Sequence, residues 1–225
     1  MKSVLISIQP KWCDLIASGK KTIEVRKTKP KLETPFKVYI YCTKGDSLNY
    51  LKRPFFDNYQ KYWVDNKAFG ANVARANGKV IGEFMCDCIA NYEAELWDDE
   101  TFESIREFYE PDDFAEYGEY EYKPVADNSD DFWKENMLCK ASCLIIEELR
   151  AYLGAGFTEF YGWGISDLVI YDKPKELNEF VIQRKITTLT TEHNIEGIVH
   201  YPQEKYIFEK LTRPPQSWCY VEALE

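Results

Sequence analysis

The 225-residue sequence is poor in histidine and has no long apolar run. Its two histidines, His193 and His200, lie far from any candidate serine nucleophile, so a Ser-His-Asp triad has no support. No stretch approaches the 18 apolar residues that a membrane-spanning helix requires. The N-terminus has no long apolar segment before a small-residue cleavage site, so we expect no secretory signal. A dinucleotide fingerprint is also missing, because Gly162-x-Gly164 lacks the third glycine.

The seven cysteines form neither a disulfide framework nor a typical zinc motif. Their number is odd and their spacing irregular, in a chain large enough to form a core without cross-links. Cys86-x-Cys88 and Cys139-x3-Cys143 both lack the two-residue spacer of a zinc knuckle. We therefore expect reduced thiols in a cytoplasmic protein, with no metal and no cofactor.

The net charge of -10 hides two oppositely charged regions. Residues 1–80 have a balance of +10, whereas residues 93–135 have a balance of -14. A basic region can attract a nucleotide or a nucleic-acid backbone. The acidic segment keeps the chain soluble or meets a protein partner.

The alternation of strands and turns predicts an α+β, mainly β fold. With 45% hydrophobic and 16% aromatic residues, the chain can form one domain over residues 1–225, with insertions at about 45–77 and 91–160. Because most strands follow turns, we expect a small, closed or nearly closed mixed β-barrel with flanking helices. We expect a helical or irregular acidic insertion at 91–135 and a short helix at 176–183, within an ambiguous stretch. The expected strands are 4–9, 36–42, 79–89 and 162–171, and residues 213–221 are expected to form a turn and a final strand. The expected helices are 11–18 and 144–153.

The segment from Ser18 to Lys27 predicts a helix end followed at once by a strand. Gly19 can adopt the left-handed conformation that closes a helix, and the β-branched residues after it favour an extended chain. Strand alternation would place Glu24 and Arg26 on one face and Lys21 on the other. The Glu–Arg pair could line a pocket or form a solvated polar surface.

A second carboxylate, Glu83, lies in the middle of an apolar strand. A buried carboxylate needs a partner. Lys21 or Arg26 could be that partner if their strands are near; alternatively, Glu83 faces water from an edge strand.

The pattern Gly19-x-Lys21-x-x-Glu24-x-Arg26 resembles the signature of the ASCH domain family. The order of the flanking elements agrees, as do Gly82-Glu83 and the segments at 161–167 and 213–221. The resemblance implies a PUA-like β-barrel whose cleft is lined by the motif and binds RNA, a nucleotide or a modified nucleoside. We expect the ligand-binding residues to be Lys20, Lys21, Glu24, Arg26, Glu83, Trp163, Ser217 and Trp218.

Three functions remain open from the sequence. In a binding module, Lys21 and Arg26 could hold a phosphate while tryptophans such as Trp163 stack a base, or those tryptophans could simply pack in the core. One branch of small ASCH proteins is similar to amidohydrolases acting on N4-acetylcytidine, and there Lys21 and Glu83 would be catalytic. That branch has a threonine where this chain has Glu24, which favours binding over catalysis. The third possibility is an adaptor that contacts a protein through residues 93–135.

Overall fold

The computed structural model describes residues 2–44, 78–96, 102–108, 122–126, 137–154, 159–194 and 197–224. The proposed insertion at 45–77 lies outside these residues. No helix among the described residues is both long and apolar enough to cross a membrane.

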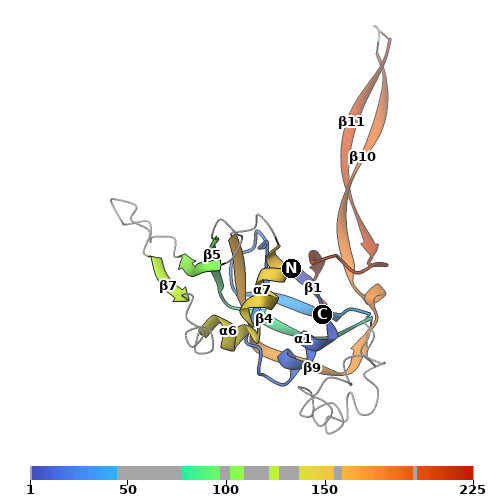
Figure 1. Cartoon of the computed structure of the whole chain (residues 1–225). Coiled ribbons are helices and arrows are strands. Elements are labelled where there is room, and N and C mark those ends of the chain that lie inside the picture. The colour runs from blue at the N-terminus through green and yellow to red at the C-terminus, as the bar shows by residue number, and fades with distance from the viewer. Residues whose placement is uncertain are drawn as a thin grey trace.

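Within the described ranges, the β-structure consists of two five-stranded sheets and one long hairpin (Figure 1). In the first sheet β1 and β3 are parallel, and the other neighbours are antiparallel. In spatial order its strands are β12 (Trp218–Glu222), β1 (Lys2–Ile8), β3 (Phe36–Cys42), β4 (Lys79–Cys86) and β9 (Ser166–Lys175). The antiparallel second sheet consists of β2 (Ile23–Arg26), β8 (Glu159–Gly164), β5 (Ile89–Leu96), β6 (Phe102–Phe108) and β7 (Tyr122–Ala126).

The helices of the described ranges are short. Pro10 occupies the first turn of α1, where its missing N–H costs nothing, and Gly19 follows the helix with a φ of 72°, as predicted. The helices of the described chain are α1 (Pro10–Ala17), α6 (Met137–Ser142), α7 (Ile146–Leu153) and the 3-10 turn η2 (Leu177–Glu179).

The chain passes between the two sheets at two corners. The sequence predicted one strand over 79–89 and one over 162–171, but each is divided into two strands that belong to different sheets. The two corners meet where Gly164 N–H donates to Cys88 O at 2.9 Å. A Cβ on Gly164 would lie 2.5 Å from Asp87 Oδ1 and 2.6 Å from Cys88 Sγ, so a larger residue here would have to displace both side chains.

The main core lies against one face of the first sheet and includes residues of both sheets. Val4, Ile6, Val38 and Ile40 are fully buried there. Trp163, from β8, packs edge-on to Phe36 with ring centroids 5.9 Å apart. The predicted mainly β fold is therefore correct. We predicted a closed or nearly closed barrel, but no closed barrel is found among the described strands, which form two sheets with free edge strands.

Residues 91–135 differ from the expected helical or irregular insertion. Where this segment is described, it extends β5 and forms β6 and β7, which widen the second sheet. Aromatic and β-branched residues favour extended structure, so its aromatic content is compatible with strands.

A long hairpin was missed by the sequence interpretation. β10 (Val181–Asn194) and β11 (Gly197–Lys210) pair with each other along 14 residues. Figure 1 shows them standing away from the two sheets. Phe180 and Leu211, at the base, are buried in a second core on the opposite face of the first sheet.

Candidate functional site

The motif places three charged side chains together in a buried row. Lys21, Glu24 and Arg26 are only 2%, 6% and 7% exposed. Glu24 lies between the two cations, with Oε1 2.9 Å from Arg26 Nη2 and Oε2 3.4 Å from Lys21 Nζ. The row therefore combines two positive charges with one negative charge.

Lys21 reaches this row because it precedes β2 instead of belonging to it. The amides of Lys20 and Lys21 both donate to Leu15 O at 2.9 Å, so Lys21 is still tied to the end of α1. Strand alternation starts only at Ile23. The prediction that Lys21 faces away from Glu24 is wrong for this reason, and Thr22, between Lys21 and β2, is exposed.

Backbone carbonyls from distant segments fix the two cations. Lys21 Nζ donates to Ser142 O at 2.6 Å, at the end of α6. Arg26 Nη2 donates to Ser7 O at 2.7 Å, and its Nη1 donates to Ser217 Oγ at 3.4 Å. Arg26 Nε is buried and has no partner among the described residues. One donor of the guanidinium thus remains unused by the protein part that the structure describes.

Burial lowers the pKa of Lys21, and the nearby Glu24 carboxylate opposes that change without cancelling it. Burial raises the pKa of Tyr152, which the guanidinium of Arg26 partly offsets. Both effects arise because these groups are shielded from water next to charged neighbours.

The row forms part of a cleft of about 570 Å³. The cleft lies at the carboxyl ends of the parallel strands β1 and β3, where Ile8 and Thr43 line it, and α7 closes the other side. This volume falls within the range of small-ligand pockets. The lining residues are Ser7, Ile8, Gln9, Trp12, Lys21, Glu24, Val25, Arg26, Thr43, Leu144, Glu148, Ala151, Tyr152 and Gln216.

Two aromatic side chains lie beside the charged row. The ring centroid of Trp12 is 5.1 Å from Lys21 Nζ, and Tyr152 is near Arg26. Lys11 Nζ also lies over the Trp12 ring, 4.0 Å from its centroid, and forms an ion pair with Glu148 of α7. The cleft therefore combines a charged floor with aromatic surfaces near both cations.

Glu83 does not line this cleft, although the sequence suggested it as a partner of Lys21 or Arg26. It lies opposite Tyr39 in the β3–β4 register, and its carboxylate contacts Lys37 Nζ at 2.7 Å and Tyr171 Oη at 2.5 Å. Burial alone would raise the pKa of Glu83, but the hydrogen bonds from Lys37 and Tyr171 bring it below its ordinary value. The expected partner was therefore wrong, because the neighbouring strand β3 already supplies a lysine.

Of the other expected site residues, one contacts the charged row and the rest lie away from the cleft. Ser217 contacts Arg26, whereas Lys20 is exposed and does not line the cleft. Trp163 is fully buried in the core, so it cannot stack on a ligand. Trp218 packs on the same core and donates its indole N–H to Thr28 Oγ1 at 3.0 Å. The structure favours core packing over base stacking for both tryptophans.

Sequence reasoning missed Trp12 and the residues of α7 that line the cleft. Trp12 lies on the helix that leads directly into the motif, and this position was the signal that could have found it. Glu148 and Tyr152 come from a segment more than 100 positions later, and no sequence signal connected them to the motif. Their contribution depends on where the fold places α7.

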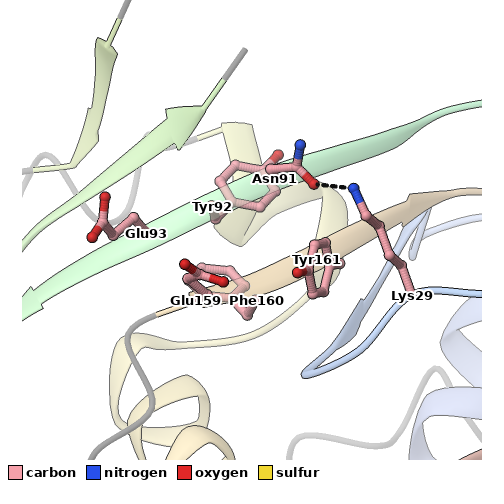
Figure 2. A pocket seen from close by; sticks show the side chains of 7 residues that line it. All are labelled: Lys29, Asn91, Tyr92, Glu93, Glu159, Phe160 and Tyr161. Atoms are coloured by element: carbon pink, nitrogen blue, oxygen red, sulfur yellow. Dashed lines mark hydrogen bonds between the residues drawn. The ribbon is translucent and has the colours of Figure 1, made fainter. Parts of the chain in front are cut away.

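A second, smaller hollow of about 180 Å³ lies beside β5 and β8 (Figure 2). There Lys29 Nζ donates to Asn91 Oδ1 at 3.2 Å and lies 5.2 Å from the Tyr161 ring. Figure 2 shows Glu93 and Glu159 toward the other end of the hollow from Lys29. None of the expected site residues lines it, and its only cation is exposed. The larger cleft is therefore the stronger candidate.

Comparisons with known proteins identify the family of this chain. A profile of the ASCH domain family matches residues 6–123, which is more than half of the chain. The protein belongs to the ASCH domain family.

Solved structures also resemble the chain. The crystal structure of the ASCH protein from Zymomonas mobilis is 16% identical, with a TM-score of 0.37, and the alignment covers 76% of this chain and 69% of that chain. Two single-substitution variants of the same Zymomonas mobilis protein have the same identity and TM-score; those alignments cover 77% and 76% of this chain and 73% and 70% of theirs. A search of curated proteins gave no match.

Proposed function

We propose that this ASCH protein binds single-stranded RNA or a nucleotide-like ligand in the cleft above Lys21, Glu24 and Arg26. The observation that carries the proposal is the buried row itself. Two cations and one carboxylate leave a net positive charge at the bottom of a cleft large enough for a nucleotide. A buried positive charge attracts a phosphate or a carbonyl oxygen more strongly than an exposed one does.

The donors and acceptors in the row match the groups of a nucleotide. Arg26 Nε can donate to a phosphate or base carbonyl, since it has no partner within the described residues. Glu24 can accept from a base amino group, because each carboxylate oxygen has capacity beyond its contact with a cation. Trp12 and Tyr152 offer faces on which a base can stack.

The amidohydrolase alternative receives less support. It requires Lys21 and Glu83 to share a proton-transfer site, and Glu83 instead bonds Lys37 and Tyr171 outside the cleft. The lowered pKa of Lys21 suits proton transfer, but the second group of that mechanism is not beside it. Binding therefore remains the better supported function.

Two lysines that each pair with a glutamate provide a matched test. Lys21→Gln removes the cleft cation, whereas Lys37→Gln removes the cation that pairs with Glu83. Binding of labelled uridine, cytidine and adenosine oligoribonucleotides would be measured by fluorescence anisotropy, alongside N4-acetylcytidine incubated to detect cytidine.

We expect Lys21→Gln to weaken RNA binding at least tenfold, because a charged hydrogen bond contributes about 1.5–3 kcal/mol. We expect Lys37→Gln to change it less than twofold. Equal losses in the two variants, or no saturable binding by the unmodified protein, would contradict the proposal. Release of cytidine that depends on Lys21 would restore the hydrolase alternative.

A further inference from the structure

The projecting hairpin exposes large apolar side chains on one face. Leu189, Tyr206 and Phe208 are 72%, 57% and 63% exposed. The register pairs Leu189 with Pro202, Lys185 with Tyr206 and Gln183 with Phe208, so all three project from the same side of the ribbon. We call this side the arm face. Its side chains are Gln183, Lys185, Thr187, Leu189, Pro202, Glu204, Tyr206 and Phe208.

The hairpin has no packing partner within the described residues for its exposed apolar side chains. A two-stranded hairpin is marginally stable in water, and large apolar side chains on it gain free energy when another surface covers them. Among the described strands, β10 and β11 pair only with each other. The arm face is therefore a surface that another molecule could cover.

The charges of the arm argue against a nucleic acid as that partner. Residues 181–210 contain four Lys or Arg and four Asp or Glu, so their net charge is zero. Lys185 also lies 2.6 Å from Glu204, and Arg184 lies 3.5 Å from Glu209. Cations that already have carboxylate partners offer little attraction for phosphates. A neutral, partly apolar partner fits the arm face better.

The order of side chains along the arm face is self-complementary. A half-turn about an axis at the level of the Ile186–Lys205 pair would place the Phe208 level of one copy against the Leu189–Pro202 level of the other. The same half-turn places the Lys185 level against the Glu204 level. The half-turn places each strand over the same strand of the other copy, so Phe208 lies opposite Pro202 and Leu189 lies opposite Gln183. Lys185 of one copy lies diagonal to Glu204 of the other, in addition to its pair with Glu204 of its own copy. No like-charged side chains of these levels oppose each other.

We propose that the arm face binds the arm face of a second copy of this chain, giving an antiparallel two-fold dimer of ribbons. A 14-residue strand is roughly 46 Å long, so the two ribbons can overlap along most of their length. Three large side chains from each copy, which are 57–72% exposed, can bury roughly 700 Å² in total, and the polar side chains of the arm face add to this area. Specific interfaces of this size are small and weakly held, so the dimer should be reversible.

Sedimentation velocity between about 1 and 200 µM tests this interface with the whole protein. We expect Phe208→Ser and Leu189→Ser to weaken dimerisation at least tenfold. Tyr201→Ser is the matched control, because Tyr201 is 47% exposed on the opposite face of the same ribbon. Thermal melting confirms that each variant keeps its fold, and Lys21→Gln should leave the dimer unchanged, which separates this proposal from the cleft.

Two results would overturn the proposal. The first is a monomer over the whole concentration range, and the second is a dimer that both arm-face variants leave intact. If the protein is monomeric and Phe208→Ser weakens RNA binding instead, the arm face contacts nucleic acid and not a second copy.

Discussion

Replacing Glu24 by Gln tests whether the buried row behaves as one electrostatic unit. The substitution keeps the size of the side chain but removes the only negative charge between Lys21 and Arg26. Both cations are more than nine-tenths buried, so water cannot replace the lost partner. Breaking a buried ion pair in this way costs about 3–5 kcal/mol.

Glu83→Gln is the matched control for this prediction. Its carboxylate also pairs with a lysine, but the side chains of Glu83 and Lys37 are 22% and 34% exposed. Partly exposed pairs contribute about 0–1 kcal/mol. The hydrogen bond from Tyr171 is weakened but not lost, because the amide oxygen of glutamine can still accept it, and this adds at most about 1 kcal/mol. Urea unfolding at pH 7 should therefore show a larger loss for Glu24→Gln. Equal losses in the two variants would refute the argument that burial makes the motif row special.

The pH dependence of the free energy of unfolding gives a second test of the Glu24→Gln variant. Burial lowers the pKa of Lys21 from its ordinary value of 10.5 in the folded chain. Between the two pKa values the unfolded chain binds more protons, so the free energy of unfolding rises with pH. Without Glu24 the pKa of Lys21 falls further, and this rise should begin at a lower pH. A variant whose stability is flat in this range would contradict the reasoning.

Two further substitutions probe the fold around the site. In Gly82→Ala, the added Cβ would lie 2.4 Å from Val169 O. Urea unfolding should show that the free energy of unfolding falls by about 1–3 kcal/mol, because β4 and β9 must separate locally. An unchanged midpoint would contradict that close approach. Asp14 is buried with an unpartnered Oδ1 among the described residues, and burial raises its pKa from 3.8 to about 8. The unfolded chain therefore releases this proton first, and stability is lost as the pH rises from about 4 to 8. Asp14→Asn should remove that loss, so unfolding curves at pH 5 and 8 should differ less in the variant than in the unmodified protein.

Local sequence determined much of the motif and its flanks. Pro10 and Gly19 mark the two ends of α1, and the β-branched residues after Gly19 predicted the following strand. The apolar strands β1, β3 and β12 were also predictable, because their sequences contain short apolar runs bounded by turn residues. Glu24 and Arg26 were correctly expected on one strand face, since alternation in a strand is a local property.

Local patterns could not place the strand breaks or the long hairpin. The segments 79–89 and 162–171 are each continuous in apolar character, so nothing in their periodicity marks the corners at Asp87–Cys88 and Ile165. The hairpin residues mix threonine with charged residues and do not alternate cleanly. Its strands have both faces in water along much of their length, and the usual contrast between buried and exposed positions is therefore weak.

The cleft itself depends on tertiary structure. Sequence indicated that Lys21, Glu24 and Arg26 carry the chemistry of the motif, but not that they would be buried in one row. That row exists because the end of α1 holds Lys21 before β2, while the carbonyls of Ser7 and Ser142 come from distant segments to fix the cations. Glu83 and Trp163 had equally suggestive positions in the sequence, yet the fold directs one toward Lys37 and the other into the core. Side-chain type and spacing are local properties, whereas the neighbours that a side chain meets are decided by the packing of the whole chain.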